Sequence, residues 1–363
     1  MCVANCQPGW LNGSAHWWRV AEAFLSLSRR DQADALGVAA DRSGRPVHLL
    51  QKDVWVVWAL ETLFAAPFGP HLVFKGGTSL SKAYQAIARF SEDVDLTYDI
   101  RAIAPDLAEP GSEGLPANQS QEQKWTKTIR TRLDAWTTDT VVPTLARRLS
   151  ELGLTATVAA QGAMATITYE PLAAGTGYVG PVVLLEFGAR STGEPSEPRP
   201  VTCDAAPFLP DVVFPSVTPA VMRPGRTFWE KATAIHVFCR GGKLRGDDRF
   251  SRHWYDIVAL DRSGHASAAL ADRSLADRVG RHKNVFFREK DSAGAYIDYA
   301  AAVRGRLQLV PEGDRLATLA DDYARMVDDR LLFETPPTFE SVIERCQDIQ
   351  RRANTESPLS EAT

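Results

Sequence analysis

Long apolar runs are absent from this sequence. The longest, VWVVWAL at residues 54–60, is stopped by Glu61 and is far shorter than the roughly 18 residues that a membrane-spanning helix needs. The first ten residues contain no basic region followed by an apolar core, so we expect no secretory signal peptide. These two features predict a cytoplasmic protein that does not enter the membrane.

Cysteine and net positive charge are also scarce. The five cysteines are an odd number without zinc or disulfide spacing, which is typical of cytosolic thiols. The net charge of −4 argues against a protein that coats nucleic acid. Two local segments, 240–253 and 281–290, nevertheless carry an excess of Arg and Lys. They indicate either a local phosphate or RNA track or simply solvated helical faces.

The stretch VFKGGTSLSKAYQAIARFSEDVDLTYD, at residues 73–99, is the most informative part of the chain. It predicts a strand at 71–74, a turn at Gly76 and Gly77, a helix opened by Thr78 and Ser79, and a second strand. Asp93 and Asp95 lie two apart on that second strand and should share one face. Paired carboxylates of this kind usually serve a cation.

The glycine turn resembles neither a Walker loop nor a dinucleotide-binding fingerprint, because its glycines are adjacent. A glycine turn that leads into a helix can still bind phosphate through its N–H groups. We expect Gly76, Gly77, Thr78 and Ser79 to contact the phosphates of a nucleotide. A phosphate-binding segment next to paired carboxylates provides the minimum set of groups needed for metal-assisted transfer of a nucleotidyl or phosphoryl group.

Glu186 is the candidate for a third carboxylate. It lies near the end of the apolar strand PVVLLEF at 181–187, where a charge is costly unless it is paired or metal-bound. A strand-end salt bridge with Arg190 is the alternative. We therefore expect Asp93, Asp95 and Glu186 to hold Mg²⁺ or Mn²⁺.

Two helices in the second half of the chain carry further candidates. Lys231, in the apolar helix that follows Phe228, could neutralise triphosphate charge. Arg252 and Asp256 lie at i and i+4 and share one helix face, so Asp256 could orient Lys231 or Arg252. The alternatives are a solvated lysine and an ordinary surface ion pair. His253 falls on another face, which favours a structural role.

The order of these patterns predicts an N-terminal core of strands and helices that precedes a helical domain. The strands are expected at 71–74, around Asp93, and at 155–160, 165–170 and 181–187. The helices are expected at 14–36, 49–66, 119–152, 228–239, 252–262, 267–279, 315–329 and 337–352. The predicted divisions are an N-terminal core at 1–215, a helical domain at 216–352 and a disordered tail at 353–363.

Four motifs in this order, VFKGGTSLSKAY, RFSEDVDL, WEKATAIH and RHWYDI, resemble the abortive-infection nucleotidyltransferase toxins of the AbiEii/AbiGii family. The similarity covers about residues 48–345. It implies an α+β fold, in which a polymerase-beta-like nucleotidyltransferase core with a mixed sheet is joined to a C-terminal helical domain. It also implies a toxin of a bacterial toxin–antitoxin or phage-defence system, with a cognate antitoxin as partner.

The resemblance maps the turn motif onto Gly76, Gly77 and Thr78, and the metal pair onto Asp93 and Asp95. It places the lysine motif on Lys231 and the Arg-x-x-x-Asp motif on Arg252 and Asp256. The expected reaction transfers a nucleotide from a nucleoside triphosphate to an RNA acceptor, with a tRNA 3′ end as the leading candidate. Nucleotidylation of a protein or small molecule, and a non-catalytic nucleotide-binding role, remain alternatives.

Overall fold

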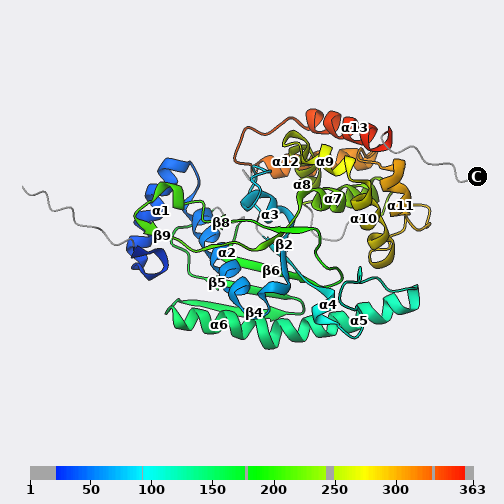
Figure 1. Cartoon of the computed structure of the whole chain (residues 1–363). Helices are drawn as coiled ribbons and strands as arrows, with labels where there is room; N and C mark the ends of the chain where they lie inside the picture. Colours follow the sequence, from blue (N-terminus) through cyan, green and yellow to red (C-terminus); the bar gives the residue numbers. More distant parts are fainter. Residues whose placement is uncertain (1–21, 92, 176–178, 243–248, 329–331, 356–363) are drawn as a thin grey trace, which may run out of the picture.

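A mixed β-sheet forms the middle of the molecule, and helices cover both of its faces (Figure 1). The computed structural model describes residues 22–91, 93–175, 179–242, 249–328 and 332–355. Seven strands of this described part form the main sheet, in the order β4-β5-β6-β3-β2-β11-β7. The β3–β6 and β11–β2 pairs are parallel, and the other neighbours are antiparallel. The predicted α+β class with a mixed sheet is thus confirmed.

The strands of the main sheet are β2 (Leu72–Lys75), β3 (Asp93–Tyr98), β4 (Ala156–Gln161), β5 (Met164–Tyr169), β6 (Val182–Gly188), β7 (Ser196–Pro198) and β11 (Ala220–Met222). Two smaller pairings join β1 (Glu22–Ala23) to β9 (Val212–Val213), and β8 (Val201–Thr202) to β10 (Ser216–Val217). The helices are α1 (Arg29–Ser43), α2 (Val47–Ala65), α3 (Gly76–Lys82), α4 (Ile100–Ile103), α5 (Gln119–Trp136), α6 (Val142–Glu151), α7 (Pro224–Cys239), α8 (Ser251–Arg262), α9 (His265–Ala271), α10 (Arg273–Phe286), α11 (Tyr299–Ala301), α12 (Asp314–Asp328) and α13 (Phe339–Thr355).

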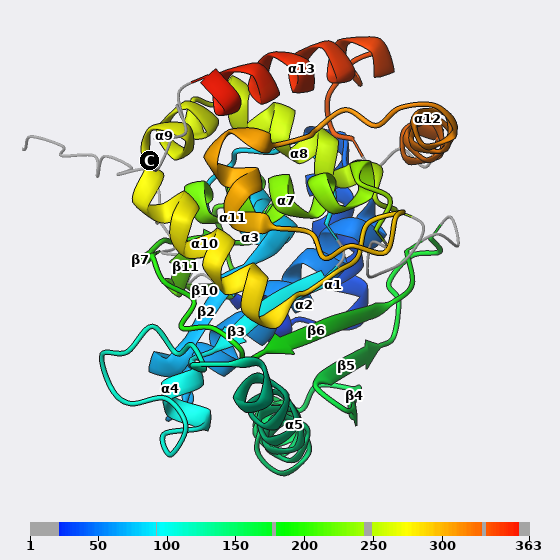
Figure 2. The same cartoon turned by 90° about the vertical axis from the view of Figure 1, so that its right-hand side faces the viewer.

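The two faces of the sheet are covered by helices from different halves of the chain. Helices α2, α5 and α6 pack with the strands into one buried cluster that includes Trp58 and Leu145. Helices α7, α8, α10 and α13 form a second buried cluster around Trp229 and Trp254, which α3 joins through Leu80. Figures 1 and 2 both show α5 and α13 at opposite ends of the molecule. The short helix α3 is therefore the element of the β2–α3–β3 unit that faces the helical half.

Some predicted elements differ from the structure. The expected helix at 14–36 is wrong for 22–28, because Ser28 caps α1 by accepting the Asp31 N–H, and α1 then runs on to Ser43. Residues 14–21 lie outside the described part. The long helix expected at 119–152 contains a π-helical turn at 137–141, just before Pro143. The expected helix at 267–279 is two helices, because Asp272 caps α10 by accepting the Leu275 N–H.

The division of the chain into domains stays a prediction. Strand β11 lies within the main sheet, pairs with both β2 and β7, and leads directly into α7. Helix α13 runs to Thr355, and the rest of the expected tail lies outside the described residues. Among the helices in the described ranges, none combines the length and apolar character needed to cross a membrane.

Candidate active site

Helix α3 follows β2 directly, so Gly76 and Gly77, expected to form a turn before the helix, are its first two residues, and both are closely packed. Gly76 has a φ of +80°, and a Cβ atom there would collide with the Asp95 carboxylate. A Cβ atom on Gly77 would lie 2.5 Å from Arg89 Nη2 and 2.9 Å from Ser91 Oγ. The backbone of the turn thus lies directly against the carboxylate strand, as a close approach to a ligand requires.

The hydroxyl groups of Thr78 and Ser79 are used inside the protein. Thr78 Oγ1 donates to the main-chain oxygen of Asp93 at 2.5 Å, and Ser79 Oγ donates to that of Gly76 at 2.9 Å. Both residues are buried. These bonds fasten α3 to β3, so any phosphate contact at this turn would be made by main-chain N–H groups.

Three carboxylates lie on the neighbouring strands β3 and β6. Asp93 and Asp95 alternate with the fully buried Val94, which places their side chains on the other face of the strand. Glu186 stands directly opposite Asp95 in the parallel register. Burial raises the pKa of Glu186, and the charges of Asp95 and Asp93 raise it further. The repulsion behind that shift is what a bound cation would relieve.

Lys75 is a member of this site that sequence reasoning missed. It pairs with Asp95 across β2 and β3, and its Nζ lies 3.8 Å from Asp95 Oδ1. Burial lowers the pKa of Lys75, but Asp95, Glu230 and Glu186 outweigh it and raise that pKa. Its position directly before Gly76 and Gly77 is the sequence feature that could have identified Lys75 as part of the site.

Asp256 belongs to a different cluster. Its carboxylate is fully buried and accepts from Arg89 Nε at 2.7 Å and Arg89 Nη2 at 2.8 Å, while Lys231 Nζ lies 2.9 Å from Oδ2. Burial would raise the pKa of Asp256, but Arg89 and Lys231 outweigh it and lower that pKa. Asp256 is therefore paired with Lys231, as one expectation had it, and its second partner is Arg89, where an Arg252 pair was the alternative.

Arg252 interacts electrostatically with members of both clusters. Its Nε donates to the main-chain oxygen of Arg249 at 3.1 Å. Burial and the charge of Arg89 lower the pKa of Arg252, while Asp93 raises it. Arg252 also interacts electrostatically with Glu186. Its guanidinium group is thus within electrostatic range of the carboxylates.

A cavity of about 300 Å³ opens beside these groups, and its walls include Lys75, Gly76, Asp95, Lys231 and Lys283. A cluster of lysines around an aspartate is suited to an anionic ligand with a cation attached. The structure therefore brings the glycine turn, one of the paired carboxylates and the predicted lysine to one cavity.

Two further polar groups on this cavity lack partners. Thr227 Oγ1 and His253 Nδ1 are buried and make no hydrogen bond to any residue in the described ranges. A buried polar atom without a partner is costly, so the two atoms mark an energetically unfavourable part of the cavity wall. His253, expected to be structural, therefore lies on the cavity wall. Sequence offered no signal for Thr227.

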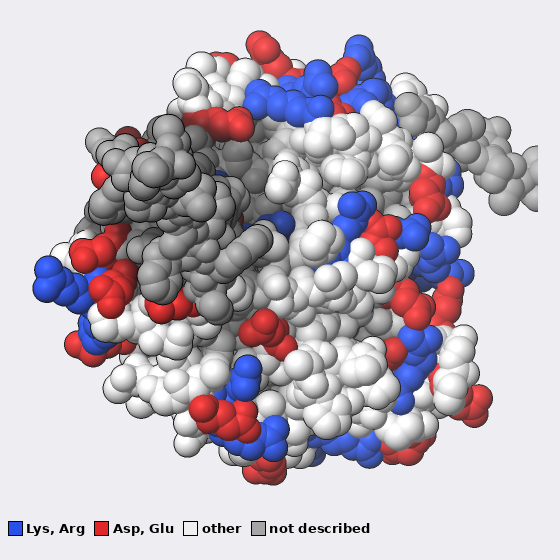
Figure 3. Space-filling view, turned by 60° about the vertical axis from the view of Figure 1, so that its left-hand side comes forward, with Lys and Arg blue, Asp and Glu red and all other residues white. Residues whose placement is uncertain are grey.

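The described basic residues of the two segments, 240–253 and 281–290, lie in different surroundings. Lys283, expected to guide an acceptor away from the glycine turn, lines the same cavity as Gly76. Burial lowers its pKa, and the nearby charges of Lys75 and Arg226 add to that effect. Arg240 pairs with Asp291 at 3.1 Å, while Lys243 and Arg245 lie outside the described residues. On the face shown in Figure 3, Lys and Arg are interspersed with Asp and Glu over the described surface.

The described residues contain no group of three or more His, Cys, Asp or Glu side chains arranged to hold a metal ion by themselves. Mg²⁺ rarely needs such a cage, because it is usually bound through one or two carboxylates together with substrate phosphates. The oxygen donors of Asp93, Asp95 and Glu186, and their mutual repulsion, fit that mode of binding.

Comparison with known proteins supplies the family. Residues 58–345 match the family model described as "Nucleotidyl transferase AbiEii toxin, Type IV TA system". Among solved structures, the chain is similar to MenT4, a nucleotidyltransferase toxin from Mycobacterium tuberculosis H37Rv, with 17% sequence identity and a TM-score of 0.42. That alignment covers 92% of this chain and 100% of MenT4, and so low a TM-score supports no inference about function. Comparison with curated proteins gives no match. Because the family match spans most of its length, the chain belongs to the AbiEii nucleotidyltransferase toxins of type IV toxin–antitoxin systems.

Proposed function

We propose that this toxin transfers a nucleotide from a nucleoside triphosphate to the 3′ hydroxyl of an RNA, with the 3′ end of tRNA as the expected acceptor in the cytoplasm. The observation that carries the proposal is the register that sets Glu186 opposite Asp95, beside Gly76 and the lysine-lined cavity. A carboxylate site next to a phosphate site is what in-line nucleotidyl transfer requires.

Asp93, Asp95 and Glu186 would hold the divalent cation, Mg²⁺ or Mn²⁺. When bound, that cation would neutralise charge on the triphosphate and polarise the phosphorus under attack. Lys231 and Lys283 would contact triphosphate oxygens from the α7 and α10 walls of the cavity. Because Asp256 holds Lys231 by an ion pair of 2.9 Å, that lysine would be positioned before the nucleotide arrives.

Glu186 would orient the acceptor hydroxyl and take its proton. The acceptor oxygen forms a bond to the α-phosphorus, the bond from that phosphorus to its bridging oxygen breaks, and pyrophosphate leaves. An ionised carboxylate at this place can accept that proton. The main chain of Gly76 and Gly77 would allow the phosphates to approach closely.

The acceptor is the least constrained part of the proposal, and a protein or small molecule could occupy the same place. The test is to incubate the protein with each labelled nucleoside triphosphate and total cellular RNA, with and without Mg²⁺, and to separate labelled RNA from labelled protein. Label in small RNA that depends on Mg²⁺ and disappears with Asp95→Asn would support the proposal. Label found only in protein would favour the alternative, and binding without transfer would favour a non-catalytic role.

A further inference from the structure

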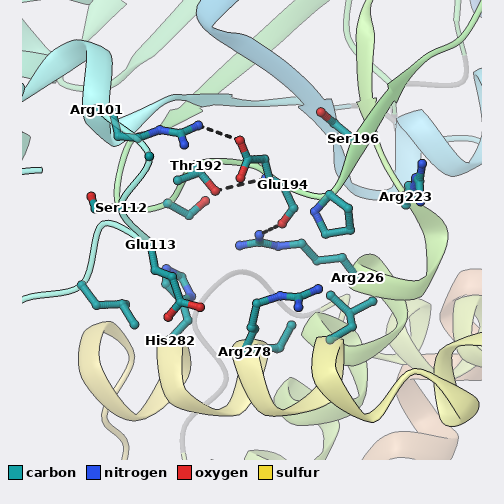
Figure 4. Close-up of a pocket in the computed structure, with 16 residues that line it drawn as sticks. Arg101, Ser112, Glu113, Thr192, Glu194, Ser196, Arg223, Arg226, Arg278 and His282 are labelled. Carbon is teal, nitrogen blue, oxygen red and sulfur yellow. Dashed lines mark hydrogen bonds and ion pairs between the residues drawn. The ribbon is translucent and has the colours of Figure 1, made fainter. Parts of the chain in front are cut away.

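A second cavity, of about 610 Å³, shares two walls with the catalytic cavity and is drawn in Figure 4. On α7, Arg226 lines the second cavity and Glu230, one turn later, lines the catalytic one. On α10, the neighbours His282 and Lys283 divide in the same way. The two cavities are therefore neighbours along α7 and α10.

Four arginines line this second cavity, against two glutamates. Figure 4 shows Arg101 and Arg226 reaching the loop that carries Glu194, with Arg278 extending from α10. Three of the four are matched by carboxylates: Arg101 by Glu194 at 2.7 Å, Arg223 by Glu197 at 3.1 Å, and Arg226 by Glu230 at 3.1 Å.

Arg278 differs from the other three. It is exposed, and its Nη1 donates to Ser274 Oγ at 2.7 Å. No carboxylate pairs with it in the part of the chain that the structure describes. Since Glu113 is paired with Arg281, the cavity keeps an excess of positive charge centred on Arg278.

The opposite wall offers hydroxyl groups. Ser191 Oγ accepts the Gly193 N–H at 3.2 Å, and Thr192 Oγ1 accepts the Glu194 N–H at 3.3 Å. Each hydroxyl still has its own hydrogen to donate, and the described residues show no acceptor for it. Guanidinium and hydroxyl donors on facing walls are the groups that proteins use to bind phosphate oxygens.

Glu230 separates the positive charges of the two cavities. Burial would raise its pKa, but Arg226, Lys75 and Lys283 outweigh it and lower that pKa to about 2. Its ionised carboxylate therefore stands between the lysines of the catalytic cavity and the arginines of the second. The catalytic cavity keeps Asp95 for a metal-bound triphosphate, whereas the second cavity offers mainly donors.

We propose that the second cavity binds the phosphodiester backbone of the acceptor RNA next to its 3′ end, with Arg278 as the principal phosphate contact. The proposal rests on the proposed function for the identity of the acceptor. The volume is larger than one phosphate group needs and leaves room for a sugar as well. A strand held there would continue past Arg226 and Glu230 into the catalytic cavity.

The test measures binding without transfer. A fluorescein-labelled single-stranded RNA of ten nucleotides is titrated with the full-length protein at two salt concentrations, without nucleotide or Mg²⁺. The variants are Arg278→Gln and Arg278→Lys. The matched control is Arg147→Gln, which removes an exposed helical arginine of α6 that lines neither cavity. A non-hydrolysable nucleoside triphosphate is titrated in parallel with Mg²⁺.

We expect Arg278→Gln to weaken RNA binding several-fold and to reduce the log–log salt slope by about 0.7, the value for one phosphate of a single strand. Arg278→Lys should restore part of the affinity, while Arg147→Gln and the triphosphate titration should match the wild type. An unchanged RNA affinity and slope for Arg278→Gln would overturn the inference, as would a loss of triphosphate binding in place of RNA binding.

The outcomes also separate this inference from the proposed function. If the wild type extends RNA but Arg278→Gln binds it normally, the reaction stands and the second cavity is not the acceptor site. If the wild type transfers label only to protein and yet binds RNA through Arg278, the cavity assignment stands and the proposed acceptor is wrong. A wild type that binds no RNA overturns the inference, whatever the transfer assay shows.

Discussion

Two carboxylate clusters lie near α3, and they differ in how far neighbouring cations neutralise their negative charge. Asp256 is fully buried and is neutralised by Arg89 and Lys231 at 2.7 to 2.9 Å. Asp95 keeps 31% of its side chain exposed, faces a cavity, and has Lys75 at 3.8 Å. The charge of Asp256 is thus balanced by two cations at short range, whereas Asp95 has one cation at a longer distance. A compensated carboxylate indicates a positioning role, and an under-compensated one indicates a ligand site.

The largest effect should come from breaking the Asp256 cluster. Asp256→Asn leaves two buried cations without a counter-charge, which typically costs about 3–5 kcal/mol of unfolding free energy. Chemical denaturation followed by circular dichroism measures the loss. Asp95→Asn is the matched control, because it removes a carboxylate that repels its neighbours. Equal losses in the two variants would erase the distinction between the clusters.

The Asp256 effect also has a defined pH dependence. The pKa of Asp256 is lower in the folded protein than in the unfolded chain, so its stabilisation is present at neutral pH. The stability gap between wild type and Asp256→Asn should stay constant down to about pH 4, the usual range of an aspartate, and shrink only below it. A gap that closes at neutral pH would contradict this assignment.

The second largest effect should be the loss of catalysis when Asp93 or Asp95 is neutralised. Asp93→Asn and Asp95→Asn should each lower the transfer rate by about 10³-fold, since each removes charge from the proposed cation site at little steric cost. The folded state should be as stable as that of the wild type. A purified, folded variant with near wild-type transfer in Mg²⁺ would show that the metal site lies elsewhere.

Glu186 should show a smaller loss with a distinct signature. Glu186→Gln should lower the transfer rate by about 10²-fold and raise the Mg²⁺ concentration needed for half-maximal activity. Asp256→Asn, studied where it is still folded, should leave that Mg²⁺ concentration unchanged, because Asp256 acts through Lys231. The reverse pattern would make Asp256 the third carboxylate.

The smallest effect concerns Lys283. The sequence placed it in a basic segment expected to guide the acceptor, whereas in the structure it lines the catalytic cavity. Lys283→Gln should weaken triphosphate binding by about 5- to 10-fold, in keeping with the loss of one charged contact. RNA affinity without nucleotide should change much less. A variant that loses RNA affinity and keeps its triphosphate affinity would return Lys283 to the role expected from sequence.

The parts of the site that follow from local sequence could be predicted. The β2–α3–β3 unit is contiguous, so the alternation of Asp93, Val94 and Asp95 reveals its own register. Glu186 could be found because an acid in an apolar strand is costly. The pairing of Arg89 with Asp256 spans 167 residues, and no local pattern carries it. Thr227 could not be predicted for a different reason, since only the folded structure shows that its buried hydroxyl makes no hydrogen bond to the described residues.

The fold shows the same division. Long, periodic helices such as α2 could be located, because their apolar spacing repeats over several turns. The strands between 196 and 222 have two or three residues each and stand among prolines, so no period can form. Helix ends depended on single capping residues, as Ser28 and Asp272 illustrate.

Strand β11 has a practical consequence for anyone who divides this chain. A fragment that ends at residue 215 would lack β11, although that strand lies between β2 and β7 in the sheet. Its removal would uncover the hydrogen-bonding groups of β2, the strand that leads into Gly76. An uncovered strand edge of this kind invites pairing between molecules. Expression of the N-terminal half alone should therefore give aggregates, whereas a fragment that retains β11 keeps that edge paired.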